Sequence, residues 1–362
     1  MNESPRKVYL DILRIVAIFL VVFNHTPAFH FPFFTFEEHI GTKLMRIISA
    51  FDKVAVPLFL MISGALLLPK HETISTLLKK RVCRFVIVLL LFQVMQAVYY
   101  AVACGENGIG IRSFLSDCYW GSIEKGFVLG WAGAGTVWYF YVYIGVLLML
   151  PFLRNMVKGM ETVHFHYLFA IQMVFFVLCP ALFVMITGVS PEDFALIKYL
   201  PLCSNIFIYV FAGYYAEHVV KVETLRKKHF IWLVTAAAMF IILASMMPEW
   251  TQIRMFGSRV KQYVPGVWPY LVVPCITLYL IVKKFVTSFS LSGRVTSVLQ
   301  SLGGAVFTVM LVENILRQQL GTFFSAYETT YLPSILVSCL VCVIGLLLGV
   351  ICKKIPVLRK LL

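Results

Sequence analysis

Apolar windows of about 18 or more residues recur from one end of this chain to the other. An α-helix needs about that length to cross the hydrocarbon core of a bilayer, because it rises about 1.5 Å per residue. The chain has 362 residues, of which 60% are hydrophobic and 13% charged, whereas about a quarter of the residues are charged in soluble domains. Since too little polar surface remains to face water, the sequence predicts an all-α, polytopic integral membrane helix bundle.

About ten membrane-spanning helices are predicted, all within one membrane domain over residues 1–362. We find no internal repeat, linker or low-complexity segment that would divide the chain. The first apolar span is longer than the core of a signal peptide and lacks a small-residue cleavage site, so we expect it to remain in the mature protein. The predicted helices lie near residues 8–27, 44–68, 82–104, 136–153, 163–187, 196–217, 229–247, 264–282, 297–318 and 331–352.

Basic residues set the expected orientation. A net charge of +14 would suggest nucleic acid as a partner of a soluble protein, but here the basic residues form short runs between apolar spans. Ten crossings put both chain ends and the even-numbered connections on one side, with 20 of the 31 Lys and Arg residues, against eight in the opposite loops. The positive-inside rule then predicts that both ends are cytoplasmic. We expect the protein to lie in a cell (inner or plasma) membrane. We expect the lipid bilayer as a partner, and no nucleic acid.

The connection 105–135 is the most unusual of the predicted external loops. It holds eight of the 22 Gly residues together with Trp and acidic side chains, so we expect it to fold over or dip into the outer mouth of the bundle. Cys104 and Cys118 flank part of this loop and are candidates for a disulfide. Because no Cys or His spacing is typical of a metal site, we predict none.

Three ionisable residues lie within the first predicted helix, where each costs about 2.5–3.5 kcal/mol on insertion scales. They are Asp11, Arg14 and His25. Eleven steps of about 100° separate the Arg from the His, so both face within about 20° of the same direction, about 16.5 Å apart. An Arg binds phosphate or carboxylate through its forked donors, and a His accepts a proton from a hydroxyl near neutral pH. This spacing suits an extended donor that enters from the cytoplasmic side.

A simpler interpretation of the same residues stays open. Asp11 and Arg14, three residues apart, neutralise each other, and His25 is then an interfacial residue at the end of the helix. The residues of this helix alone favour neither interpretation.

Further short runs, taken with the first helix, give the chain a family resemblance. In their order and spacing they resemble membrane acyltransferase family 3, whose signature is an Arg, ten residues and a His on the first helix. The resemblance covers nearly the whole chain. The similar runs are 56–67, which contains Ser63-Gly64, the basic step 80–84, the segment 138–140 with the closing Leu150-Pro151, and 211–215.

The chain departs from the family pattern on its ninth predicted helix, the penultimate one. The family often carries a Ser-x-Gly-x-Tyr-x-x-His segment there, whereas this chain has Ala305, Phe307, Val309 and Val312 at the matching positions. This departure bears on activity or on the usual acceptor. Glu313 follows directly, and with Arg317 it has the i, i+4 spacing of a self-neutralising pair; a contact of Glu313 with substrate is the alternative.

The resemblance implies transfer of an acyl group, usually acetyl, from acyl-CoA to an acceptor. The donor, acetyl-CoA or another acyl-CoA, is cytoplasmic, and the acceptor is a hydroxyl or amine of a cell-envelope glycan, lipid-linked sugar or small molecule. In this interpretation Arg14, helped by Arg81 and Arg84, orients the donor, Asp11 holds Arg14, and His25 is the general base. A covalent acyl-His intermediate is an alternative.

The remaining candidate residues for substrate binding each have an ordinary structural explanation. Arg81 and Arg84 are also typical positive-inside residues, and Ser63 lies beside a Gly at a position that suits close helix packing. Trp138 and Tyr139 also suit the aromatic belt at a membrane interface.

Two other classes of function remain open from the sequence. A transporter or flippase places buried charges along a pathway and makes no bond, but it does not need the fixed Arg14 to His25 separation. A catalytically inactive sensor or scaffold is favoured by the missing late His. The enzyme is the favoured class.

Overall fold

The protein is an all-helical bundle in the computed structural model, which describes residues 6–26, 40–103, 137–188, 206–257, 266–324 and 330–361. The loop 105–135, with Cys104 and Cys118, lies outside the described residues. The helices are α1 (Val8–Asn24), α3 (Ile40–Asp52), α4 (Ala55–Leu67), α5 (Ile74–Leu77), η2 (Leu78–Val82), α6 (Cys83–Ala103), α9 (Val137–Lys158), α10 (Thr162–Met173), η6 (Val174–Leu178), α11 (Cys179–Thr187), α13 (Phe207–Tyr214), η9 (Tyr215–Val219), η10 (Val222–Thr224), α14 (Lys227–Phe256), η11 (Trp268–Leu271), α15 (Val272–Thr287), α16 (Gly293–Phe323), α17 (Tyr331–Cys352) and α18 (Pro356–Leu361).

Each of the ten predicted spans contains a helix, which confirms a polytopic membrane bundle. Among the described residues, seven helical segments are long and apolar enough to cross a membrane. The first span is shorter than predicted, because α1 ends at Asn24 after 17 residues and His25 is its C-cap. The second span is divided into α3 and α4. Pro57 explains this break, since it has no N–H to donate to the carbonyl of Lys53 four residues earlier.

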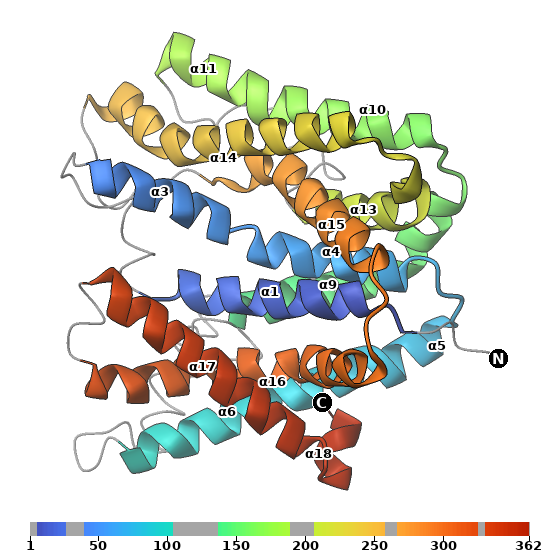
Figure 1. Cartoon of the computed structure of the whole chain (residues 1–362), viewed down its shortest axis with the longest axis vertical. Helices are drawn as coiled ribbons and strands as arrows, with labels where there is room; N and C mark the ends of the chain where they lie inside the picture. The colour runs from blue at the N-terminus through green and yellow to red at the C-terminus, as the bar shows by residue number, and fades with distance from the viewer. Residues whose placement is uncertain are drawn as a thin grey trace.

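The first helix, α1, lies in the interior of the bundle. In Figure 1 it runs between α3 and α4 on one side and α16 and α17 on the other, and it packs against α4, α15, α16 and α17. Leu13, Ala17, Ile18 and Val22 on it are fully buried. The helix with three ionisable groups is therefore surrounded by protein, where such groups can find partners.

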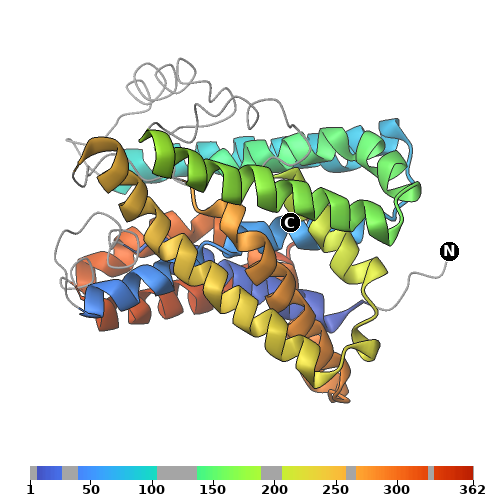
Figure 2. The same cartoon turned by 90° about the horizontal axis from the view of Figure 1, so that it is seen from above.

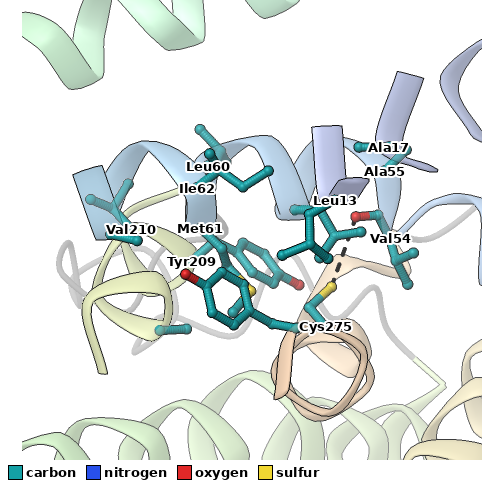
Figure 3. Packing of buried hydrophobic residues seen from close by; sticks show 14 of the residues in the cluster. Leu13, Ala17, Val54, Ala55, Leu60, Met61, Ile62, Tyr209, Val210 and Cys275 are labelled. Carbon is teal, nitrogen blue, oxygen red and sulfur yellow. Dashed lines mark hydrogen bonds between the residues drawn. The ribbon is translucent and has the colours of Figure 1, made fainter. Parts of the chain in front are cut away.

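The helices α4 and α13 cross with their backbones in contact. A methyl group added to Gly64 would lie 1.9 Å from the carbonyl oxygen of Val210, and one added to Gly213 would lie 1.8 Å from that of Met61. Figure 3 shows Met61 and Val210 on these neighbouring helices, beside the buried Tyr209. Two of the runs that carry the family resemblance, 56–67 and 211–215, are thus packing partners, and small residues permit their close approach.

Both ends of the membrane region lie at the same end of the bundle. Arg6, just before α1, donates a hydrogen bond to the carbonyl of Gln300 at 2.8 Å. Lys353, just after α17, donates to the carbonyl of Gly304 at 2.5 Å. Arg6 and Lys353 therefore both lie against the first turns of α16, as an even number of membrane crossings requires. Figure 2 shows the helices extending between the two ends of the bundle. The assignment of this end to the cytoplasm stays a prediction.

Candidate active site

A histidine and a glutamate meet at the far end of α1. The Nδ1 atom of His25 lies 2.9 Å from Oε1 of Glu313, which comes from α16, 288 residues later in the chain. The Glu313 side chain is 2% exposed and the His25 side chain 24%. Because a carboxylate accepts this hydrogen bond, Nδ1 carries the proton and Nε2 is left as the basic nitrogen of the ring. A base held by an acidic partner is the arrangement of a catalytic dyad.

Arg317 also lies near Glu313, but farther from it than His25 does. Its Nε lies 3.8 Å from Oε2 of Glu313, and its Nη2 donates to Oδ1 of Asn314 at 2.9 Å. Glu313 therefore has two partners, the expected Arg317 and, at a shorter distance, His25. The i, i+4 spacing gave no sign of that partner.

The position of the missing late His is filled by packing residues. Val312 packs with the apolar cluster that includes Phe307 and Phe140. Ala305 and Val309 face α17, where methyl groups added to Gly349 and Gly345 would lie 2.7 Å from the Ala305 Cβ and 3.2 Å from Val309. In the segment where the chain departs from the family pattern, these residues therefore pack α16 against its neighbours. The polar group beside His25 comes from Glu313, the residue after Val312.

Near the opposite end of α1, one buried carboxylate binds two arginines. Asp11 is fully buried and its Oδ1 lies 2.7 Å from Nη1 of Arg14. Arg6 donates to both oxygens of the same carboxylate, at 2.6 and 2.9 Å. Gly303 of α16 makes room for it, because a methyl group there would lie 2.4 Å from the Asp11 Cβ. The three groups carry a net charge of +1, and Arg6 is a partner that the spacing of Asp11 and Arg14 did not indicate.

Further cationic side chains surround this carboxylate. Burial lowers the pKa of the Lys353 ammonium, and the charges of Arg6, Arg14 and Arg84 lower it further. A cluster of cations in a partly buried position is suited to an anion with several charges, such as a phosphate ester.

Arg81 and Arg84 differ in their surroundings. Arg81 lies in the π-helical turn η2 and donates to both oxygens of Glu72, at 2.8 to 3.2 Å. Glu72 also accepts from Arg154 at 2.8 Å; burial opposes ionisation of this carboxyl, but its hydrogen bonds with the two arginines hold its pKa below the ordinary value. Arg84 is exposed, at the start of α6. The two predicted phosphate ligands are therefore not equivalent.

Tyr143 on α9 connects these arginines with Ser63. Its hydroxyl lies close to that of Ser63, and the charges of Arg14, Arg81 and Arg84 act on it. Ser63 also donates to the carbonyl of Phe59 at 2.8 Å. Tyr143 was missed from the sequence, although it follows the candidate Tyr139 by four residues and so shares its helix face.

Trp138 and Tyr139 separate into different environments. Tyr139 is buried and packs against Phe59 and Tyr143, with ring centroids 6.2 Å away in each case. Trp138 is 38% exposed and its ring lies 5.7 Å from that of Trp268. Tyr139 therefore belongs to the protein interior near Ser63, and Trp138 has the exposure expected of an interfacial residue.

Comparison with known proteins gives one match. A family model described as acyltransferase domain matches residues 7–354, nearly the whole chain. No curated protein and no solved structure matches the chain. The matched region contains the Arg14 and His25 spacing, the basic step at Arg81 and Arg84, and the two runs that meet at Gly64 and Gly213. The chain thus belongs to the membrane acyltransferase family 3.

Proposed function

We propose that the protein transfers an acyl group, most simply acetyl, from cytoplasmic acyl-CoA to a hydroxyl or amine. The acceptor is a cell-envelope glycan, a lipid-linked sugar or a small molecule, and the membrane is the inner or plasma membrane. The observation that carries this proposal is the arrangement along α1. The pair of His25 and Glu313 lies at one end and the cations around Asp11 lie towards the other, about 16.5 Å apart for eleven residues of helix.

The cationic end supports the binding of the phosphates of coenzyme A. Arg14 is one quarter exposed and its charge is only partly balanced, because it shares Asp11 with Arg6. Arg84 is exposed, and its charge acts on Lys353, as that of Arg14 does. Guanidinium groups bind phosphate oxygens in pairs, which orients the donor as well as attracting it. Arg81 contributes less directly, since Glu72 already occupies its donors.

The other end supports general-base catalysis by His25. As the acceptor oxygen attacks the thioester carbonyl, Nε2 of His25 takes the hydroxyl proton, and the positive charge that develops on the ring is stabilised by Glu313. When the carbon–sulfur bond breaks, the departing thiolate takes that proton back from His25. The products are the acyl ester and free coenzyme A, so protons and electrons balance without a metal or a redox cofactor.

The first experiment measures free thiol released from acetyl-CoA by purified protein, alone and with cell-envelope extract, and follows a labelled acetyl group into product. We expect label in the extract only with active protein, and we expect His25→Ala to abolish transfer while the elution volume in detergent stays normal. An acyl-His intermediate would appear as label on the protein without acceptor, absent in His25→Ala. If vesicles that contain the protein transport extract components across their membrane without release of thiol, the transporter class would be favoured instead.

A second variant tests the donor end. Arg14→Ala should raise the half-saturating concentration of acetyl-CoA about tenfold or more, because a charge-assisted pair of hydrogen bonds is lost. Arg14→Lys should recover little of it, since a point charge lacks the forked geometry. Equal donor affinity in wild type and both variants would remove Arg14 from the donor site.

A further inference from the structure

A groove opens on the surface where the end of α15 lies against the beginning of α14. The two helices pack against each other (Figure 1), and the groove between them has a volume of about 340 Å³ with walls that are almost entirely apolar. Binding sites for small molecules have volumes of about 300–1,000 Å³. The residues that line the groove are Phe230 of α14 and, from α15 and the turn after it, Ile281, Lys284, Phe285, Ser288 and Phe289.

The apolar side chains of this groove are exposed. The Phe285 side chain is 64% exposed, and its ring centroid lies 4.8 Å from that of the exposed Phe289. Directly after Phe230 on α14, Ile231 and Trp232 are exposed as well. Contiguous exposed apolar surface of this kind is typical of contact with a membrane. The groove therefore opens on a side of the bundle that we expect lipid to cover.

The groove lies at the same end of the bundle as the two ends of the membrane region. Lys283, which precedes Lys284, lies 3.4 Å from Oε2 of Glu217. Lys7, just before α1, forms an ion pair with the other oxygen of the same carboxylate. The end of α15 and the beginning of α1 are therefore neighbours, at the end that the positive-inside rule assigns to the cytoplasm.

Positive charge borders the groove. Lys284 lines it and donates one hydrogen bond, to the carbonyl of Val222 at 3.3 Å. Within the described part of the chain Lys284 forms no ion pair, and two of its three N–H donors remain for a ligand. The segment 221–230, which contains both Val222 and Phe230, holds four Lys or Arg residues and one Glu, a net charge of +3 with His neutral. The apolar groove thus has a cationic border.

The combination of apolar walls and cationic border distinguishes between three kinds of ligand. Inorganic phosphate would use the cations and leave the apolar walls empty. A lipid with a zwitterionic headgroup would fill the walls but bring no net charge to balance the cations. An anionic phospholipid does both, and basic pockets between membrane helices on the cytoplasmic side bind such headgroups in other proteins.

We propose that this groove binds one anionic phospholipid of the cytoplasmic leaflet. An acyl chain lies against Phe230, Ile281 and Phe285, and the phosphate of the headgroup accepts a hydrogen bond from Lys284. The proposal goes beyond the proposed acyl transfer and does not depend on it, because none of the residues assigned to donor binding or to the base lines the groove.

The test measures binding of radiolabelled phosphatidylglycerol to the purified full-length protein in detergent. Unlabelled phosphatidylglycerol, phosphatidylcholine with the same acyl chains, and inorganic phosphate are the competitors. We expect saturable binding of about one lipid per protein. Phosphatidylcholine should compete about fivefold or more weakly than phosphatidylglycerol, as for the loss of attraction to at least one basic residue. Inorganic phosphate should not compete.

Two substitutions test the two parts of the site, each with a matched control. Lys284→Gln should weaken binding of phosphatidylglycerol about fivefold, whereas Lys158→Gln, which removes an exposed cation from the last turn of α9, should stay within about twofold of wild type. Phe285→Ala should weaken binding of both lipids a few-fold, because apolar contact is lost. Phe152→Ala should stay within about twofold, since its ring is also 64% exposed but lies on α9, outside the groove.

Thermal unfolding separates lipid binding from a structural effect. Without added lipid, Phe285→Ala and Phe152→Ala should melt at the wild-type temperature, because both rings are exposed. Added phosphatidylglycerol should raise the melting temperature of wild type and of Phe152→Ala, since a ligand that binds only the folded state stabilises it. The rise should be smaller for Phe285→Ala and for Lys284→Gln, and Lys284→Arg, which keeps the charge, should recover most of it.

Several results would overturn the proposal. Equal competition by phosphatidylcholine would remove the anionic headgroup, and full competition by inorganic phosphate would show a site for a free anion. Equal losses in Phe152→Ala and Phe285→Ala, or binding that does not saturate, would show a general lipid layer without a specific site. Each of these results would leave the proposed acyl transfer untouched, because no step of the assay uses acyl-CoA.

Discussion

The substitution Glu313→Gln tests whether the pair formed by His25 and Glu313 acts in the proposed reaction. Glutamine has the size of the glutamate and fits the same site on α16, so the hydrogen-bond distance of 2.9 Å to Nδ1 can be kept. The negative charge is lost, and with it the stabilisation of the ring as it becomes positively charged. The amide of glutamine can also donate to Nδ1, which would move the ring proton to Nε2 and block the base.

The magnitude follows from the geometry of this contact. A hydrogen bond to a charged group contributes about 1.5–3 kcal/mol and a neutral one about 1 kcal/mol. Because the Glu313 side chain is 2% exposed, water screens little of the difference, and we take the loss to be about 2 kcal/mol in the transition state. At about 1.4 kcal/mol for each factor of ten, the rate of acetyl transfer should fall about thirtyfold, and more if the ring proton moves.

The assay is labelled acetyl transfer at saturating acetyl-CoA, with His25→Ala and the double variant measured in parallel. Glu313→Gln should lower the turnover rate with little change in the concentration of donor needed, and it should have no further effect once His25 is removed. The control is Glu161→Gln, which makes the same change at the N-cap of α10, outside the pair of His25 and Glu313. A folded Glu313→Gln protein within about threefold of the wild-type rate would refute the dyad.

Three further predictions concern register, packing and orientation. One Ala inserted after Ile18 lengthens α1 by only about 1.5 Å but turns its two ends by about 100° relative to each other. A folded insertion variant should therefore lose nearly all acyl transfer, and a normal transfer rate would exclude the shared-face geometry. Gly213→Ala should lower the melting temperature strongly, because the Met61 carbonyl oxygen lies 1.8 Å from the added methyl group. Gly145→Ala is the control, and it should leave the melting temperature unchanged or higher, because no atom lies within 4 Å of its added methyl group. Equal effects of the two substitutions would contradict the close crossing of α4 and α13. A single Cys in 105–135 should react with an impermeant thiol reagent from outside and one in 223–228 should not, and reversed labelling would invert the orientation.

The sequence predicted those parts of the structure that depend on local composition and periodicity. Apolar length was enough to locate the ten helical spans. Helix geometry predicted Arg14 and His25 at the two ends of one uninterrupted helix, and in the structure α1 ends at Asn24 with His25 as its C-cap. The pairing of Asp11 with Arg14 was also predicted, since its three-residue spacing lies within one helix and the contact is 2.7 Å. The organisation into one domain and the catalytic roles stay predictions.

Contacts between distant segments could not be obtained from spacing within one helix. Glu313 was identified by its spacing to Arg317, yet its closer partner is 288 residues away. Glu72 lies in a short polar connection and gives no periodic signal, although it binds Arg81 and Arg154 together.

The crossing of α4 and α13 limits how this protein can change by mutation. At each of its two glycines the nearest obstacle is a carbonyl oxygen of the opposite backbone, not a side chain that could be exchanged for a smaller one. A second-site suppressor therefore cannot arise by trimming a neighbour, since no residue type removes a carbonyl. Damage at either glycine can be reversed only at the same codon or offset by stabilising the fold elsewhere, so in a suppressor screen this crossing should yield true revertants and global stabilisers but no local compensations.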